Sequence, residues 1–233
     1  MKSLSTAKIS LIGVGGIGSP TALTLGKMGI PRLRLFDDDV VAPHNLPNQI
    51  FRLTDIERPK VTAVKEVVEL FSDAEVEAIQ EKFDGTQKLE GVVISAVDEM
   101  TQRKIIWEKV RYNIHVPLYV EARMGAEVLR LYSLNPTDPE VVRRYEATLY
   151  TSAEAVHQPC TEKSIIYTVM VAAGIITGQV KKTRRGILKE DDYGPVFCKS
   201  GSTWWKGDRS LIGYRCDCGR CFSGGRSRRF RKD

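Results

Sequence analysis

Apolar and polar positions along the first 180 residues follow two different periods. Short apolar runs of strand length alternate with longer segments whose apolar residues recur at helical spacing. The pattern predicts strands at residues 8–12, 32–36, 76–79, 92–97, 118–122 and 128–134. It predicts helices at residues 17–28, 59–71, 101–112 and 164–180. Such alternation is typical of an α/β fold with a mostly parallel sheet and helices on both of its faces.

The composition changes close to residue 182. Glycine, serine, arginine and cysteine dominate the residues that follow, and most of the excess behind the net charge of +6 lies there. We therefore expect a nucleotide-binding type of domain at residues 1–182 and a basic, cysteine-containing tail at residues 183–233, with residues 223–233 disordered. The basic tail is weak evidence for nucleic acid and carries no information on the fold.

The apolar segments are short compared with a membrane span. The longest of them, residues 164–180, falls below the usual length, so we expect it in the core or in a dimer interface. The first residues lack the basic, apolar and small-residue order of a signal peptide. We expect a cytoplasmic protein without a membrane segment.

A glycine-rich loop follows the first predicted strand and opens the first predicted helix. It reads GVGGIGS over residues 13–19 and satisfies the G-x-G-x-x-G pattern of Rossmann-like folds. Small residues and a helix N-terminus favour the approach of phosphate oxygens. Asp37, at the end of the second strand, is placed to bind ribose hydroxyls. The expected phosphate-binding residues are Gly13, Gly15, Gly16, Gly18 and Ser19. The loop alone fits NAD, FAD and ATP, and a glycine turn that only packs helix on strand is the structural alternative.

Three further segments favour ATP among these ligands. They read DDDVVAPHNLPNQ at residues 37–49, RPK at residues 58–60 and SAVD at residues 95–98, with Arg103 downstream. Lys60 at a helix start can contact phosphate as a point charge. Asp98 at the end of a strand can hold a Mg²⁺ that bridges phosphates. Because ligands bind at the carboxyl ends of strands in open α/β sheets, these groups are expected to meet there.

Together the four motifs resemble those of the ThiF/MoeB/HesA family, and the resemblance covers about residues 8–180. It implies an adenylyltransferase that uses MgATP to activate the C-terminal carboxylate of a ubiquitin-like or sulfur-carrier protein ending in glycine. It also implies a homodimer. In this reading Asp37 binds ribose, Lys60 contacts phosphates and Asp98 holds Mg²⁺. The residues that shape the nucleotide pocket are Asp39, Asn45 and Gln49. The attacking carboxylate is already ionised at neutral pH, so no catalytic base is needed.

Two features depart from the family pattern. Asn48 stands where the family usually has a phosphate-binding arginine, and Arg52 is a nearby candidate to replace it. The first strand begins within about eight residues of the start, so the family's N-terminal helix with its arginine is expected to be missing. A nucleotide-binding scaffold without activity therefore stays an alternative. An NAD(P)-dependent oxidoreductase, supported by the glycine loop and Asp37, is the other.

The five cysteines offer two further hypotheses. Cys160 precedes a predicted helix, where a thiolate has a lowered pKa, and is a candidate carrier of the activated partner; a small buried residue is the alternative. Four thiols could hold a structural Zn²⁺, although their C-x-C-x-x-C spacing is unusual. These four are Cys198, Cys216, Cys218 and Cys221. The alternative is a tail of free thiols. The basic tail also keeps a tRNA substrate open, as the less favoured partner.

Overall fold

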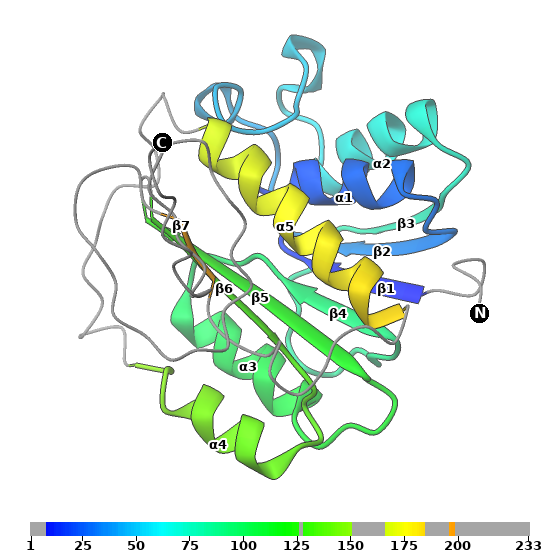
Figure 1. The fold of residues 1–233 in the computed structure, drawn as a ribbon. Helices are drawn as coiled ribbons and strands as arrows, with labels where there is room; N and C mark the ends of the chain where they lie inside the picture. Colours follow the sequence, from blue (N-terminus) through cyan, green and yellow to red (C-terminus); the bar gives the residue numbers. More distant parts are fainter. Residues whose placement is uncertain (1–7, 126–127, 151–165, 185–195, 199–233) are drawn as a thin grey trace, which may run out of the picture.

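The computed structural model describes residues 8–125, 128–150, 166–184 and 196–198. These residues form one seven-stranded sheet in the order β3-β2-β1-β4-β5-β6-β7 (Figure 1). The strands are β1 (Lys8–Ile12), β2 (Arg32–Phe36), β3 (Glu75–Ile79), β4 (Val92–Ser95), β5 (Leu118–Gly125), β6 (Val128–Leu134) and β7 (Val196–Cys198). The helices are α1 (Gly18–Lys27), α2 (Lys60–Phe71), α3 (Met100–Val110), α4 (Pro139–Glu146) and α5 (Ile166–Arg184), with short 3-10 turns η2 (Pro43–Asn45) and η3 (Leu53–Asp55).

The sheet changes direction of winding at its centre. β1 pairs in parallel with β2 on one side and with β4 on the other, and β3 and β5 extend the parallel part outward. β6 and β7 add two antiparallel pairings at one edge. Ile12 at the end of β1 lies level with Phe36 of β2 and Ser95 of β4. The carboxyl ends of these strands therefore meet at the switch point, where open α/β sheets bind ligands.

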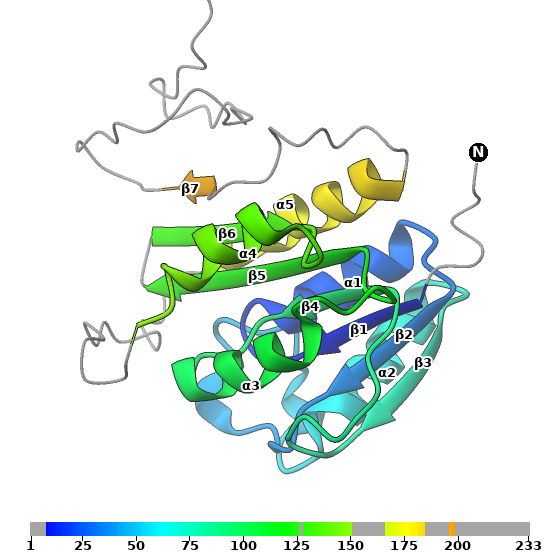
Figure 2. The ribbon, with the colours of Figure 1, turned by 90° about the horizontal axis from the view of Figure 1, so that it is seen from below.

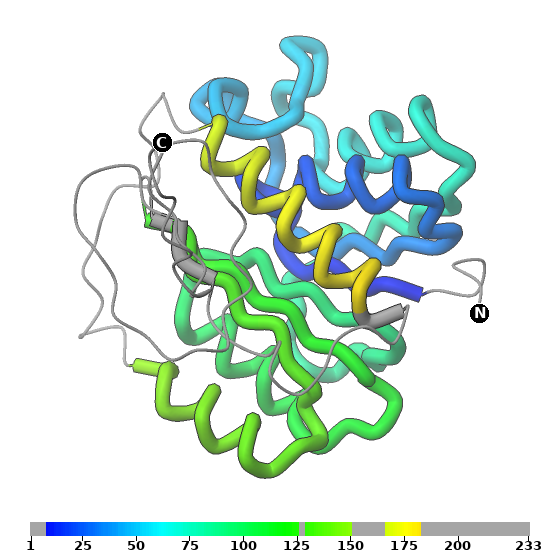
Figure 3. Tube along the Cα trace, viewed as in Figure 1, coloured from blue at the N-terminus to red at the C-terminus, as the bar shows by residue number. Residues whose placement is uncertain are grey.

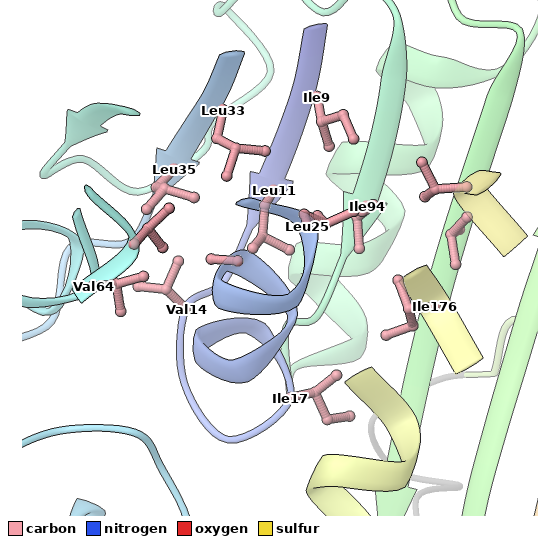
Figure 4. Packing of buried hydrophobic residues seen from close by; sticks show 14 of the residues in the cluster. Ile9, Leu11, Val14, Ile17, Leu25, Leu33, Leu35, Val64, Ile94 and Ile176 are labelled. Carbon is pink, nitrogen blue, oxygen red and sulfur yellow. The ribbon is translucent and has the colours of Figure 1, made fainter. Parts of the chain in front are cut away.

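Helices cover both faces of the sheet, as the sequence pattern predicts. α1, α2 and α5 lie on one face, and α3 and α4 lie on the other (Figures 1 and 2). Each face has its own apolar core. Figure 4 shows the first core, where Leu11 of β1, Leu25 of α1 and Ile176 of α5 pack together. The second core includes Ile106 and Trp107 of α3. The α/β Rossmann-like fold is thus confirmed.

The chain between β2 and α2 forms a long crossover segment, residues 37–59, drawn in light blue in Figure 3. It is tied down by backbone hydrogen bonds rather than by regular structure. Val41 N–H donates to Arg58 O at 2.9 Å, and Lys60 N–H donates to Asp39 O at 3.0 Å. These bonds join the start of the segment to its end and fix the start of α2.

Several element bounds differ from the prediction, and β7 was not predicted. The predicted strand at 92–97 ends at Ser95, because residues 96–98 turn toward α3. The strand predicted at 118–122 continues to Gly125, where it pairs with β6. α4 was not predicted, although its start carries two sequence signals. Asp138 caps the helix by accepting hydrogen bonds from the N–H groups of Glu140 and Val141, and Pro139 is the first helical residue.

The division into residues 1–182 and 183–233 stays a prediction. α5 runs to Arg184, and β7, which lies beyond that boundary, pairs with β6. Across the part of the chain that the structure describes, no helix combines the length and the apolar character needed to cross a membrane.

Candidate functional site

A cavity of about 490 Å³ lies at the switch point of the sheet. We call it the switch-point cavity. Its lining comes from the ends of β1, β2 and β4, from the crossover segment and from the loop after β3. The lining residues are Ile12, Gly13, Gly15, Phe36, Asp37, Asp38, Asp39, His44, Asn45, Asn48, Gln49, Lys60, Glu81, Lys82, Phe83, Ala96, Val97, Asp98, Glu99 and Gln102. Its volume is in the range of small-molecule sites.

The glycine loop lies tightly between β2 and the segment after β4. Gly13 has a φ of +87°, its N–H donates to Phe36 O at 2.8 Å, and a Cβ on it would lie 2.8 Å from Ala96 O. A Cβ on Gly18 would lie 1.9 Å from Gly13 O. Both positions therefore exclude a side chain. Gly13 and Gly15 line the cavity, and α1 begins at Gly18, three residues after Gly15.

Asp37 connects the second strand to the glycine loop. Its Oδ2 accepts the Val14 N–H at 2.8 Å and its Oδ1 accepts the Asp39 N–H at 3.0 Å. Burial raises the pKa of Asp37, and the hydrogen bond from Val14 and the charge of Lys60 oppose that rise. The carboxylate thus acts as a fixed acceptor on the wall of the cavity.

Lys60 is the first residue of α2, directly after Pro59. Its Nζ lies 2.6 Å from Oδ2 of Asp39, and its side chain is 9% exposed against 65% for Asp39. The backbone bond from Lys60 N–H to Asp39 O reinforces this pairing. The ammonium group is therefore held at the cavity wall by a carboxylate that solvent can reach.

Four charged residues fasten the end of the crossover segment; we call them the Arg52–Glu66 network. Asp55, whose side chain is fully buried, accepts hydrogen bonds from both Arg52 and Arg58. Both guanidinium groups also bind Glu66 on α2. A hydrogen bond from Arg52 lowers the pKa of Asp55, and a bond from Arg58 is the largest cause that lowers the pKa of Glu66 to about 2.

The network decides the position of Arg52. Its guanidinium binds Asp55 and Glu66, and Arg52 does not line the switch-point cavity. The hypothesis that Arg52 replaces a phosphate-binding arginine at position 48 is not supported by this arrangement. Asn48 itself lines the cavity.

Two polar residues of the crossover segment face the cavity in different ways. Asn45 is buried and its Oδ1 accepts the Ala42 N–H at 2.9 Å, so it holds the turn η2. Among the described residues, Gln49 Oε1 is buried without a hydrogen-bond partner. A buried acceptor of this kind is costly unless a ligand or water supplies a donor.

The cavity brings together most residues that the sequence predicted. Those that line it are Gly13, Gly15, Asp37, Asp39, Asn45, Gln49, Lys60 and Asp98. Gly16, Gly18 and Ser19 lie behind the lining. Gly18 serves close packing, and the Ser19 hydroxyl accepts the Ile50 N–H at 3.3 Å, which holds the crossover segment.

The residues that follow β3 also belong to the cavity and were not predicted from the sequence. Glu81, Lys82 and Phe83 line the cavity opposite the crossover segment, together with Gln102 of α3. The Gln102 side-chain amide donates to Phe83 O, and the Phe83 ring meets Phe36 edge-on at 5.8 Å. A signal was available, because the strand before these residues was predicted and parallel strands end at the same edge of a sheet.

Acidic groups dominate the metal-ligating chemistry of this region. The carboxylates of Asp37, Asp38 and Asp39 lie within 4.8 Å of one another, and Asp98 lies on the cavity wall after β4. Such oxygens suit Mg²⁺.

The cysteine hypotheses stay predictions. Four of the five cysteines lie outside the described residues; they are Cys160, Cys216, Cys218 and Cys221. Cys198 pairs with Leu129 through the β7 backbone, and its side chain is not described.

Comparison with known proteins identifies a family and a set of similar proteins. The model of the ThiF family matches residues 1–193. The sulfur carrier protein ThiS adenylyltransferase of Escherichia coli K12 is 34% identical over 131 residues, which is 53% of this chain and 52% of that protein. The SAMP-activating enzyme E1 of Haloferax volcanii is 28% identical over 127 residues, or 50% of this chain and 47% of that protein. The chain thus spans about half the length of these curated relatives.

Solved structures share the fold. Escherichia coli MccB with ATP superposes with a TM-score of 0.62 at 18% identity, covering 86% of this chain and 65% of MccB. The Escherichia coli tRNA N6-threonylcarbamoyladenosine dehydratase TcdA gives a TM-score of 0.58 at 16% identity, covering 78% of this chain and 87% of TcdA.

Proposed function

The chain belongs to the ThiF family, and on that premise we propose that it is an ATP-dependent adenylyltransferase. It activates the C-terminal carboxylate of a ubiquitin-like or sulfur-carrier protein to an acyl-adenylate and releases pyrophosphate. One observation carries the proposal: Gly13, Asp37 and Asp98, which follow three different strands, line the same cavity as Lys60 at the start of α2. The curated relatives are adenylyltransferases or activating enzymes by name, which supports the same reaction class.

The residues around the cavity fit ATP. The glycine loop brings the backbone of Gly13 and Gly15 to the cavity, where neither residue has a side chain that would hinder a phosphate. Asp37 offers a fixed acceptor for ribose hydroxyls. Gln49 Oε1, buried without a partner in the described structure, offers a second acceptor that a nucleotide hydroxyl or amine can satisfy.

The charge around the cavity supports a requirement for Mg²⁺. Two lysines, Lys60 and Lys82, face a larger number of carboxylates. These are Asp37, Asp38, Asp39, Glu81, Asp98 and Glu99. A polyphosphate brings several more negative charges into this field, so a divalent cation held by the carboxylates of the lining would favour binding. We propose Asp98 as its main protein ligand; when bound, the cation neutralises charge on the phosphates.

The chain's own residues would align the reactants. A carboxylate oxygen of the carrier attacks the α-phosphorus, the bond to the β-phosphate oxygen breaks, and pyrophosphate leaves with the bonding electrons. Lys60 stabilises the charge that develops on the phosphates, and to do so it exchanges its contact with Asp39 for one with phosphate. The carboxylate is ionised at neutral pH, so positioning supplies most of the rate.

The test is ATP–pyrophosphate exchange with purified candidate carriers. Exchange should require both Mg²⁺ and a carrier with a free C-terminal glycine, and a C-terminally amidated carrier is the matched control. Asp98→Asn should remove exchange while the protein stays folded. Exchange that is equal with the amidated carrier would contradict the proposal, because the attacking oxygen would then be absent.

A nucleotide-binding scaffold is the second candidate, and a specific observation favours it. Three arginines lie close to the cavity, and each guanidinium is bound to protein groups. They are Arg52, Arg58 and Arg103. The described lining therefore offers phosphates lysines and no arginine. ATP binding without exchange for any carrier would support this candidate, and NADH binding without ATP binding would favour the oxidoreductase.

The remaining assignments belong to the same proposal. We propose a cytoplasmic homodimer, with tRNA as the less favoured substrate class. The TcdA likeness, at 16% identity, bears on the fold alone. A Cys160→Ser variant tests whether Cys160 carries the activated partner. Metal analysis of the purified protein tests whether the four tail cysteines hold Zn²⁺.

A further inference from the structure

A buried guanidinium lies directly behind the segment that carries Asp98. Arg103 of α3 is 4% exposed. Its Nη2 donates to Val97 O, and its Nη1 donates to Asp98 O at 3.4 Å. The backbone of the segment therefore faces Arg103, while Val97 and Asp98 also line the switch-point cavity.

A buried arginine needs a counter-charge, and β5 supplies it. Nε of Arg103 lies 2.5 Å from Oε1 of Glu121, whose side chain is fully buried. β5 neighbours β4, and Glu121 is in register with Ser95, the last residue of β4. Glu121 also binds Arg123 and accepts a hydrogen bond from the Tyr145 hydroxyl. The carboxylate thus forms an ion pair with Arg103 from the strand beside the segment.

The segment is held from two sides. On one side, Gly13 lies so close that a Cβ would be 2.8 Å from Ala96 O, and Ala96 N–H donates to Ile12 O at 2.8 Å. On the other side, Arg103 binds the next two carbonyls. These carbonyls follow the end of β4 and precede α3, so neither element offers them a regular partner.

We propose that Arg103, held by Glu121, is a positioning residue for Asp98 and sets the Mg²⁺ affinity of the switch-point cavity. The inference rests on the proposed MgATP function. Arg103 contacts neither the cation nor the nucleotide; it binds the Val97 and Asp98 carbonyls and so fixes the backbone from which the Asp98 carboxylate projects. Groups that orient metal ligands in this way typically change metal affinity by about 10- to 100-fold when they are replaced.

The test compares Arg103→Lys with Arg123→Lys. Arg123 binds the same carboxylate and is 8% exposed, but its other hydrogen bonds go to Thr148. It therefore controls for a disturbed Glu121 without touching the Asp98 backbone. ATP binding is measured by calorimetry over a series of Mg²⁺ concentrations and again in EDTA. Both variants are checked for folding by circular dichroism.

We expect Arg103→Lys to raise the Mg²⁺ concentration for half-maximal tightening of ATP binding by about tenfold. ATP affinity in EDTA should stay within about twofold of the wild-type value, and Arg123→Lys should leave both quantities unchanged. If Arg103→Lys does not fold, Glu121→Gln keeps the guanidinium but weakens its hold. It should shift the Mg²⁺ dependence in the same direction.

Two results would overturn the positioning role. One is an unchanged Mg²⁺ dependence in a folded Arg103→Lys protein. The other is an equal shift in the two lysine variants, because that would mean a general disturbance around Glu121. In either case wild-type binding of MgATP would leave the proposed function standing. A wild-type protein that binds no ATP at any Mg²⁺ concentration would instead remove both.

Discussion

Lys60 is a single residue that brings a positive charge to the wall of the cavity. It is the more buried of the two lysines in the lining, with a side chain 9% exposed against 59% for Lys82. Lys60→Met should lower ATP affinity by at least about tenfold, since one charge-assisted phosphate contact is lost. The stability cost should be about 1 kcal/mol or less, because Asp39 is well solvated.

The control for this variant lies on the same helix. Lys65 pairs with Glu69 one turn along α2 and is not among the residues that line the cavity. Lys65→Met should leave ATP affinity unchanged in the same calorimetric titration. Equal losses in the two variants would indicate a general electrostatic effect and would contradict a direct contact by Lys60.

Gly13 and Gly29 allow a matched test of the glycine loop. Both have a φ of +87°, but a Cβ on Gly29 meets nothing within 4 Å, whereas one on Gly13 meets Ala96 O. Gly29→Ala should cost about 1 kcal/mol from backbone strain, a fall of about 2–4 °C in Tm, with ATP binding intact. Gly13→Ala should lower Tm further and also weaken ATP binding.

Scanning calorimetry and ATP titration of both variants separate the two effects. If Gly13→Ala loses stability but binds ATP as the wild type does, the loop would serve packing alone. That was the structural alternative considered from the sequence, and Gly18 already illustrates it, since that residue packs against Gly13 without lining the cavity.

The sequence predicted a site residue where its place next to a strand determines its position. Asp37 directly follows β2 and Asp98 comes three residues after the end of β4, so a parallel sheet places both at one edge. Among the unpredicted lining residues, Glu81 follows a predicted strand and could have been inferred, whereas Gln102 reaches the cavity only through the packing of α3. The position of Arg52 was also beyond the sequence, because two carboxylates that bind it are distributed over η3 and α2.

At the scale of elements, the Arg52–Glu66 network joins the crossover segment to α2. The hydrogen bond from Arg58, followed by that from Arg52, lowers the pKa of Glu66 from 4.5 to about 2. A depressed pKa in the folded state gives stability that is present above pH 4.5 and is lost as the pH falls toward 2. Asp55, with a pKa that is also lowered, acts in the same direction.

Glu66→Gln tests this link between α2 and the crossover segment. The variant should be less stable than the wild type at pH 7, and the difference should shrink as the pH falls from 4.5 toward 2. Urea unfolding at a series of pH values measures it. A difference that is independent of pH would show that the network contributes through packing rather than through the ionised carboxylate.

Element bounds could be predicted where the hydrophobic periodicity determines them. The prediction failed where single side chains determine them. β4 ends at Ser95, and beyond that end Arg103 binds the carbonyls of Val97 and Asp98. α4 depends on the Asp138 cap, a local signal in a segment with few apolar residues. Strand alternation alone records neither effect.

At the scale of the whole molecule, the α/β class followed from the order of apolar segments, and the choice of ATP followed from motifs at separate strand ends. The addition of β7 to the sheet could not be predicted, because its three residues lie within a segment of tail-like composition. The net charge of +6 was equally uninformative about the site. Among the charged residues that line the cavity, carboxylates outnumber lysines, so the local charge is opposite in sign to that of the chain as a whole.

This contrast in charge predicts how strongly ATP binding depends on Mg²⁺. Charges more than about 10 Å away are largely screened at 0.1 M salt, so distant lysines and arginines offset little of the local repulsion between ATP and the carboxylates. Removing Mg²⁺ with EDTA should weaken ATP binding by at least about tenfold, equivalent to about 1.4 kcal/mol. Adenosine, which carries no phosphate, should bind equally in Mg²⁺ and in EDTA. Equal affinity for ATP in both buffers would mean that the cavity neutralises the phosphates without a cation, and would contradict the role proposed for Asp98.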